Sequence, residues 1–162
     1  MRELREEQEI SLSELARRSK IGKGTLSELE SGRRNPTLET LYALTTALKV
    51  PLSTALHDLG SPARISGHAV DAVLIERFEA AASVAETYRI RIRAGTEQES
   101  GAHTPGTTEH IIVLAGTARV GGVTDPVLIG PGMHGSWAAD VRHLYQAPSG
   151  DVEALLIVRY PQ

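Results

Sequence analysis

The spacing of apolar side chains changes near residue 70. Between residues 10 and 48 they recur every three or four positions, which is typical of amphipathic helices; from Asp71 onward they tend to alternate with polar ones, which is typical of strands. Residues 88–93 alternate strictly between apolar side chains and arginines. The pattern predicts an α plus β chain of two domains, a five-helix bundle over residues 1–59 and an all-β domain over residues 68–162, joined by a linker at 60–67.

The helical part carries the signals of two helices joined by a tight turn. Ser11 and Glu14 have the spacing of a capping box, in which each side chain accepts a hydrogen bond from the other residue's backbone amide. Gly22 can take the backbone angles that a sharp turn needs, and a second helix starts near Lys23. Such a unit inserts its second helix into the major groove of DNA.

Further helices complete the predicted bundle. A first one precedes Ser11. Thr37 caps another, which carries four leucines at helical spacing. Residues 52–59 can form a short last helix behind Pro51.

Residues 24–37 form one long ordered run, Gly-Thr-Leu-Ser-Glu-Leu-Glu-Ser-Gly-Arg-Arg-Asn-Pro-Thr. Over about residues 2–59, the chain resembles the helix-turn-helix domain of the Xre/Cro/C1-repressor family. The resemblance implies a transcriptional regulator that binds double-stranded DNA at a two-fold symmetric operator, with half-sites about 34 Å or a small multiple apart. The alternative is a small helical bundle that never meets DNA.

The second helix of the motif is expected to read the DNA bases. Lys23 can donate to guanine or phosphate, Ser27 can donate or accept, and Glu28 can accept from the cytosine amino group. Residues 33–35 follow that helix and should meet the phosphate backbone, which positions the protein without specifying sequence. The residues predicted to contact DNA are Lys23, Gly24, Thr25, Ser27, Glu28, Arg33, Arg34 and Asn35.

The charge balance favours specific over non-specific DNA binding. The chain has a net charge of −3, and residues 1–60 carry nine basic and nine acidic side chains. Residues 17–34 hold six basic against two acidic side chains, at the place where phosphates would lie beside an inserted helix. We therefore expect weak affinity for arbitrary DNA, with binding dependent on specific contacts made by a dimer.

Composition argues against several other classes. Cysteine is absent, so neither a disulfide nor a thiolate metal site can form. The first nine residues are mostly charged, unlike a secretory signal, and no apolar run approaches the roughly 20 residues of a membrane helix. We expect a cytoplasmic protein without a membrane partner.

Short apolar runs in the second half recur at roughly ten-residue intervals, which is typical of a β-sandwich or barrel. Among them, residues 101–116 (GAHTPGTTEHIIVLAG) resemble the first motif of the cupin family, and residues 130–143 resemble the second. The resemblance covers about residues 68–160. It implies an all-β jelly-roll barrel that holds a metal ion with three histidines and a glutamate.

The chain keeps part of the ligand set that the cupin resemblance implies. His103 matches the first histidine, Glu109 the glutamate and His143 the last histidine, whereas Pro105 takes the place of the second histidine. Three ligands could still hold Zn, Fe, Ni or Mn weakly, because imidazole and carboxylate suit all four. The alternative is that the three side chains are the polar lining of a ligand pocket without a metal.

Other side chains border this candidate pocket. Trp137 and Tyr145 could form its apolar walls, or equally belong to the ordinary core. His134 could replace the missing ligand only if its strand leans inward. His110 should point away from the face that carries Glu109, because successive strand residues point to opposite faces.

These resemblances leave two main functions open. The first is a DNA-binding regulator, without catalytic residues, whose barrel senses a small-molecule effector or holds a homodimer together. The alternative is a metal-dependent cupin enzyme, of epoxidase or dioxygenase type, that retains a helix-turn-helix domain. Pro105 argues against this chemistry, because it removes a family ligand. A third, simpler version of the regulator has a barrel that is purely structural.

Overall fold

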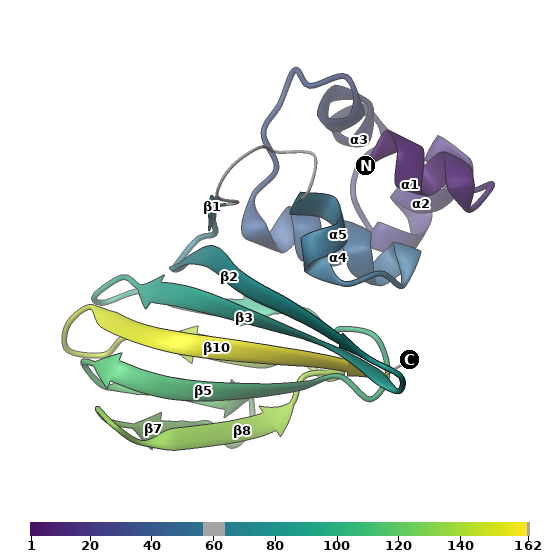
Figure 1. Cartoon of the computed structure of the whole chain (residues 1–162). Coiled ribbons are helices and arrows are strands. Elements are labelled where there is room, and N and C mark those ends of the chain that lie inside the picture. The colour runs from purple at the N-terminus through teal and green to yellow at the C-terminus, as the bar shows by residue number, and fades with distance from the viewer. Residues whose placement is uncertain (57–63, 162) are drawn as a thin grey trace.

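The computed structural model describes residues 1–56 and 64–161, as a helical domain followed by a β domain (Figure 1). The five helices are α1 (Arg2–Glu7), α2 (Leu12–Ser19), α3 (Lys23–Glu30), α4 (Leu38–Leu48) and α5 (Leu52–Leu56). Residues 57–59 of the predicted last helix lie outside the described residues. The expected order of five helices and then strands is confirmed.

Local signals in the sequence explain where the helices begin. The Ser11 hydroxyl accepts a hydrogen bond from the Glu14 amide at 3.1 Å, and the Thr37 hydroxyl accepts one from the Thr40 amide at 3.3 Å. These bonds satisfy amides that have no partner within the helix. Both predicted N-cap hydrogen bonds are therefore present. The Glu14 carboxylate, however, accepts hydrogen bonds from Arg17 and Arg18, and no bond from the Ser11 amide is found among the described residues, so the reciprocal half of the predicted capping box is not observed.

The turn between α2 and α3 differs from the expectation. The residue with the left-handed backbone is Lys20, with φ of 58°, whereas Gly22 has an ordinary φ of −58°. Placing the sharp turn on Gly22 was therefore wrong. The chain reverses at the end of α2, where a left-handed residue commonly terminates a helix.

A compact apolar cluster holds the helices together. Its fully buried members include Leu15 of α2, Leu26 of α3, and Leu44 and Leu48 of α4. Ile21, in the turn between α2 and α3, packs against this cluster. Burial of these side chains fixes the angle of α3, which carries the candidate DNA-reading residues.

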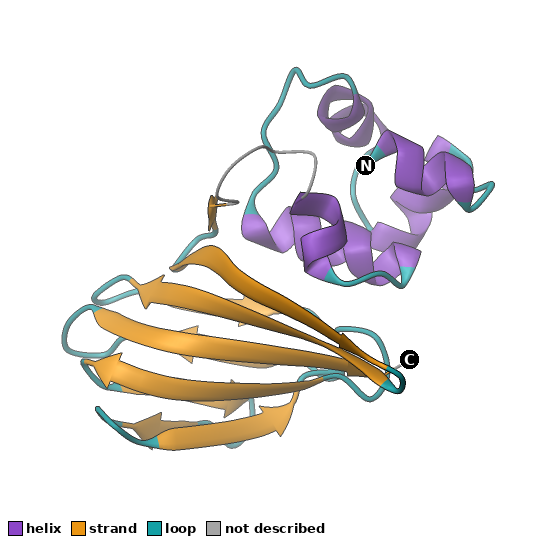
Figure 2. Ribbon diagram, viewed as in Figure 1, coloured by secondary structure: helices purple, strands orange, loops and turns teal. Residues whose placement is uncertain are grey.

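The β domain consists of two antiparallel sheets (Figure 2). One sheet has the order β1-β2-β3-β10-β5-β8 and the other β4-β9-β6-β7. The strands are β1 (Arg64–Ser66), β2 (Val70–Ala80), β3 (Ser83–Ile92), β4 (Glu97–Ser100), β5 (Thr108–Ala115), β6 (Ala118–Gly122), β7 (Val127–Ile129), β8 (His134–Ala138), β9 (His143–Gln146) and β10 (Val152–Pro161). Of the predicted linker, residues 60–63 lie outside the described residues and residues 64–66 form β1.

Strand alternation places the core between the sheets. Tyr88, Ile90 and Ile92 of β3 are buried, whereas Arg89 and Arg91 between them are exposed. The predicted period-two pattern is confirmed, because one face of β3 packs inward and the other meets solvent.

The two domains share one apolar core. Leu38 and Leu41 of α4, and Leu52 and Ala55 of α5, are buried in the same cluster as the inward side chains of the sheets. Hydrogen bonds reinforce the junction: the Ser53 amide donates to the buried carboxylate of Glu86 at 3.0 Å, and the Tyr88 hydroxyl donates to the other Glu86 oxygen at 2.5 Å. Helices α4 and α5 face the β domain, whereas α3 lies away from it (Figure 1).

Among the described residues, the helices are too short to span a membrane.

Candidate functional site

The first candidate site is the outer side of α3. Leu26 is fully buried in the helical core, so the helix turns its polar side outward. Lys23, Gly24 and Glu28 are exposed on this side, and Thr25 and Ser27 are half-buried. The five predicted contact residues of α3 are thus at least partly accessible to a bound duplex.

The segment after α3 adds further polar side chains. Arg33, Arg34 and Asn35 are exposed, as backbone-contacting residues need to be. The Arg33 Nε donates to the Ser31 hydroxyl at 2.9 Å, and an Arg34 guanidinium nitrogen lies 3.8 Å from a Glu28 carboxylate oxygen. Glu28 therefore already has a cationic neighbour, which competes with any contact to a base.

An ion pair that sequence reasoning missed anchors α3 to α1. The Arg5 guanidinium donates two hydrogen bonds to the Glu30 carboxylate, both at 2.8 Å, and a third at 3.0 Å to the Ile10 carbonyl oxygen. The bond to Glu30 raises the pKa of Arg5 above its usual value. The partners are 25 residues apart, so no local spacing signals this contact.

The second candidate site is a buried cluster inside the β domain. His103 precedes β5, Glu109 lies on β5 and His143 begins β9. All three side chains are buried, and one potential ligand atom from each lies within 4.8 Å of the others. The resemblance to the cupin motifs implied these three residues, and the structure brings them together.

Glu109 is the centre of this cluster. One of its oxygens lies 3.0 Å from the His103 Nε2, and the other accepts a short hydrogen bond from the Tyr145 hydroxyl. Burial by itself would raise the pKa of Glu109, but the charge of His143 and the hydrogen bond with His103 outweigh it and hold the pKa well below its ordinary value. Glu109 is therefore an anion inside the fold.

His143 turns its Nε2 toward the same centre. Its Nδ1 lies 2.8 Å from the Val141 carbonyl oxygen, which can only accept, so Nδ1 carries a proton. Its Nε2 is buried 3.4 Å from a Glu109 oxygen and makes no hydrogen bond of good geometry among the described residues. In the neutral ring, two acceptors then face each other, and a cation or a further proton between them would relieve the repulsion.

The protonation of His143 depends on two opposing effects. Burial lowers the pKa of His143, but the nearby charge of Glu109 prevails and raises the pKa above its ordinary value. The donor set, two imidazoles and one carboxylate around an orphaned nitrogen, fits a divalent metal ion.

Aromatic side chains surround the cluster. Tyr145 is buried with its ring centroid 5.7 Å from that of His143, and burial followed by the Glu109 charge raises its pKa well above the ordinary value. Trp137 is half-buried on β8, with its ring centroid 6.4 Å from that of His143. Both therefore adjoin the cluster, and Tyr145 contributes a polar group as well as an apolar wall.

Two other positions lie outside the cluster. His134 is exposed beside His110 with their rings stacked at 5.5 Å between centroids, so its strand does not bring it to the missing ligand position. Pro105, which takes that position in the sequence motif, is exposed.

Sequence reasoning also missed Tyr42. This α4 residue belongs to the helical domain, yet its ring lies over His103 with 4.5 Å between ring centroids. Burial, and after it the charge of Glu109, raises the pKa of the Tyr42 hydroxyl well above its ordinary value. The buried cluster is therefore completed by a residue from the other domain.

Comparisons with known proteins agree with this architecture. Residues 1–54 match the Helix-turn-helix family HTH_3, which confirms the predicted helix-turn-helix domain. Among curated proteins, the HTH-type transcriptional regulator SutR of Escherichia coli K12 is 29% identical over 151 residues, which cover 90% of this chain and 84% of that protein.

Solved structures are similar too. An HTH_3 family transcriptional regulator from Vibrio cholerae has a TM-score of 0.88 at 24% identity, covering 99% of this chain and 93% of that chain, so the two share a fold along their whole length. A cupin domain of an Xre-family transcriptional regulator from Enterobacter cloacae is similar at 24% identity and a TM-score of 0.45, covering 48% of this chain and 83% of that one.

Proposed function

We propose that this chain is a sequence-specific DNA-binding transcriptional regulator whose cupin-type β domain responds to a bound ligand. The observation that carries the proposal is the exposed polar side of α3 on a domain that matches the helix-turn-helix family. Similarity to SutR over most of the chain supports the same conclusion. The expected partner is a two-fold symmetric operator in double-stranded DNA, bound by a homodimer in the cytoplasm.

In this proposal, α3 enters the major groove. Lys23 and Ser27 read base edges, while Arg33 and Asn35 contact phosphates on the flank. Glu28 contributes less, because Arg34 already neutralises part of its charge. The Arg5–Glu30 pair holds the helix at its entry angle.

The buried cluster is the proposed sensing centre. His103, Glu109 and His143 would hold a divalent ion such as Zn, Fe, Ni or Mn, and the ion would supply a positive charge beside the orphaned His143 Nε2. With three protein ligands and Pro105 in place of a fourth, we expect a weakly held metal.

Contact between Tyr42 and His103 links this centre to the DNA-binding domain. A change at His103 acts on the ring that lies over it, and thus on α4. Helix α4 in turn packs on α2 and shares the buried core that supports α3. Occupancy can alter DNA binding only if the ligand prefers one arrangement of these elements over another.

A metal-dependent cupin enzyme of epoxidase or dioxygenase type is the second candidate. Two histidines and one carboxylate are the set that non-haem iron oxygenases use. Such an enzyme also needs open positions on the metal, whereas here the three side chains are buried and Tyr42 lies over His103. We therefore favour the regulator. Oxygen consumption by the iron-loaded protein would instead support the enzyme.

The regulator proposal is tested by selecting binding sites from genomic DNA with the full chain. We expect enrichment of a symmetric site, and replacing Lys23 and Ser27 with alanine should reduce specific binding far more than non-specific binding. A matched control is the double variant Arg89→Ala/Ser83→Ala on β3, which leaves α3 intact. Failure to enrich any sequence, or unchanged binding by the α3 variant, would contradict the proposal.

A further inference from the structure

The buried cluster needs a route by which an ion or a small ligand can reach it. Glu109 and His143 have no exposed surface, and His103 is 5% exposed. The ring of Tyr42, which belongs to the helical domain, covers His103 with 4.5 Å between ring centroids. A route past His103 therefore leads through the boundary between the two domains.

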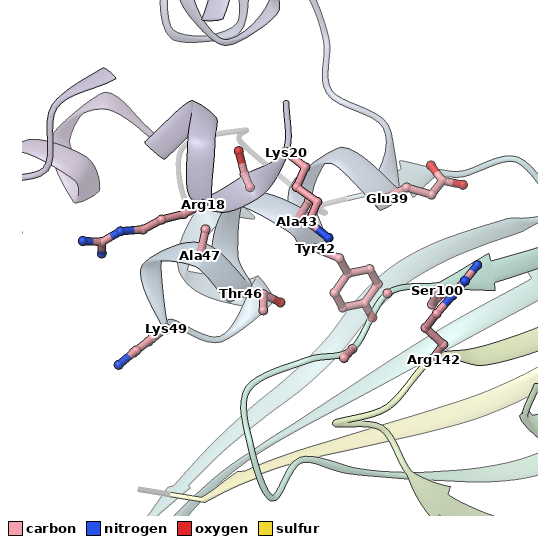
Figure 3. Close-up of a pocket in the computed structure, with 13 residues that line it drawn as sticks. Arg18, Lys20, Glu39, Tyr42, Ala43, Thr46, Ala47, Lys49, Ser100 and Arg142 are labelled. Carbon is pink, nitrogen blue, oxygen red and sulfur yellow. The ribbon is translucent and has the colours of Figure 1, made fainter. Parts of the chain in front are cut away.

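A cleft of about 920 Å³ lies at this boundary (Figure 3). Tyr42 lines it from α4 and extends toward Ser100 of the β domain (Figure 3). Gly101 and Ala102 also line the cleft and are exposed, whereas His103, the next residue in the chain, is buried. The cleft thus ends at the ring and the short segment that separate His103 from solvent.

Packing alone holds the Tyr42 side chain over His103. The ring is partly buried against the core that the two domains share, and it contacts the His103 ring. Its hydroxyl makes no hydrogen bond with any residue that the structure describes. The ring can therefore turn about its side-chain bonds without breaking a polar contact to those residues, and such rotations are fast compared with movements of whole domains.

Helix α4, which carries Tyr42, is much less free to move. Leu38 and Leu41 are buried in the core shared with the β domain, and Leu44 and Leu48 are buried in the core of the helical domain. Displacing the helix would expose these side chains to water, which is unfavourable. The cleft beside Tyr42, by contrast, is open space, so rotation of the ring is the easier movement.

We infer that the cleft is the entrance to the buried cluster and that the Tyr42 ring is its gate. The ring lies over His103 in the closed state and turns into the cleft to admit a divalent ion or a small ligand. The gate controls how fast the ion exchanges more than how tightly it is held. The inference deepens the proposed sensing centre and rests on it, and it assigns control of entry to a residue of the DNA-binding domain.

The first test is the rate at which zinc leaves the full chain. Zinc-loaded protein is mixed with excess chromogenic chelator, and stopped-flow absorbance follows the release. Tyr42→Ala should release zinc at least about tenfold faster, with a much smaller change in equilibrium affinity, because the entrance stays open. Thr46→Trp, one helical turn along α4 in the same cleft, should slow release because it fills the space that the ring needs. Wild-type rates in both variants would overturn the inference.

Controls separate gating from a general loosening of the domain junction. Leu52→Ala removes a fully buried side chain from the same shared core but leaves the cleft lining intact, and Phe78→Ala removes an exposed aromatic ring from β2. Both should release zinc much more slowly than Tyr42→Ala. Equal acceleration by Leu52→Ala would overturn the inference. Faster release by Trp137→Ala but not by Tyr42→Ala would place the entrance at β8 and would also overturn it.

Chemical modification of His103 tests the same gate without a metal. Diethyl pyrocarbonate acylates accessible imidazole nitrogens, and mass spectrometry of peptides gives the rate at each histidine. Tyr42→Ala should raise the rate at His103 and Thr46→Trp should lower it, whereas the exposed His134 should react equally in every variant. An unchanged rate at His103 in both variants would contradict the gate. Circular dichroism confirms that each variant is folded.

The two measurements separate this inference from the proposed function. If the chain binds no divalent ion while modification of His103 follows the expected order, the metal-sensing proposal fails and the gate stands. If zinc binds but neither its release nor the modification of His103 responds to the variants, the gate fails alone.

Discussion

The ring of Tyr42, from the DNA-binding domain, lies 4.5 Å between centroids from the ring of His103, a member of the buried cluster in the β domain. The two residues are 61 positions apart in the chain, and their planes are tilted by 38°. Through this contact, α4 of the DNA-binding domain packs directly on the buried cluster of the β domain.

Replacing Tyr42 with alanine should therefore loosen the domain junction. We expect the free energy of unfolding to fall by about 2–4 kcal/mol, because the variant loses a partly buried aromatic ring and leaves space over His103. Tyr42→Phe keeps the ring and should cost much less. Chemical denaturation of both variants measures the difference. Equal stability of the alanine variant and the wild type would show that the contact contributes nothing.

Metal content is the second prediction. The purified protein should carry less than one divalent ion per chain, and a mild chelator should remove it, because the cluster found among the described residues offers three side-chain ligands. Glu109→Gln and His143→Gln should abolish re-binding, as followed by elemental analysis and by the fluorescence of Trp137, the sole tryptophan. His134→Gln is the control, since that histidine lies on the outside. A tightly held, chelator-resistant ion would refute the prediction.

The ion pair between α1 and α3 allows a third prediction. Arg5→Met should lower the free energy of unfolding by about 1–3 kcal/mol, because the half-buried Glu30 carboxylate loses two hydrogen bonds. The double variant Arg5→Met/Glu30→Met should recover part of this loss, since no unpaired charge remains. Thermal unfolding of the two variants provides the comparison. If the free energy of unfolding of the double variant is lower than that of Arg5→Met, removing the unpaired Glu30 carboxylate brings no recovery. The two side chains would then not stabilise the protein as a pair.

Assembly is the fourth prediction. Two half-sites require two copies of α3, and the outer face of the six-stranded sheet carries half-exposed Ile112, Leu155 and Ile157 beside the exposed Leu114. We expect a homodimer in sedimentation at micromolar concentration, and Leu114→Glu should shift it toward monomer and weaken operator binding. Leu128→Glu, at another exposed leucine, on the other sheet, is the control. A monomeric wild type would contradict the proposed homodimer.

Much of the secondary structure can be predicted from the sequence, because interactions between neighbouring residues determine where helices begin and which faces of strands are buried. Ser11 and Thr37 begin helices through hydrogen bonds to amides three residues away, a distance that a sequence motif records directly. Strict alternation predicted the buried and exposed faces of β3. The resemblance to the cupin motifs also implied that His103, Glu109 and His143 lie together, as they do in the structure.

Contacts between segments that are far apart in the chain, by contrast, were decided only by the tertiary structure. The sequence predicted the sharp turn at Gly22, whereas the left-handed residue in the structure is Lys20, which ends α2. It contained no sign that Arg5 would meet Glu30, that Ser53 would bind Glu86, or that Tyr42 would cover His103. Periodicity and capping are properties of a few neighbouring residues, so sequence specifies them. Long-range partners depend on how complete elements pack, and this is determined only when the whole chain buries its apolar surface together.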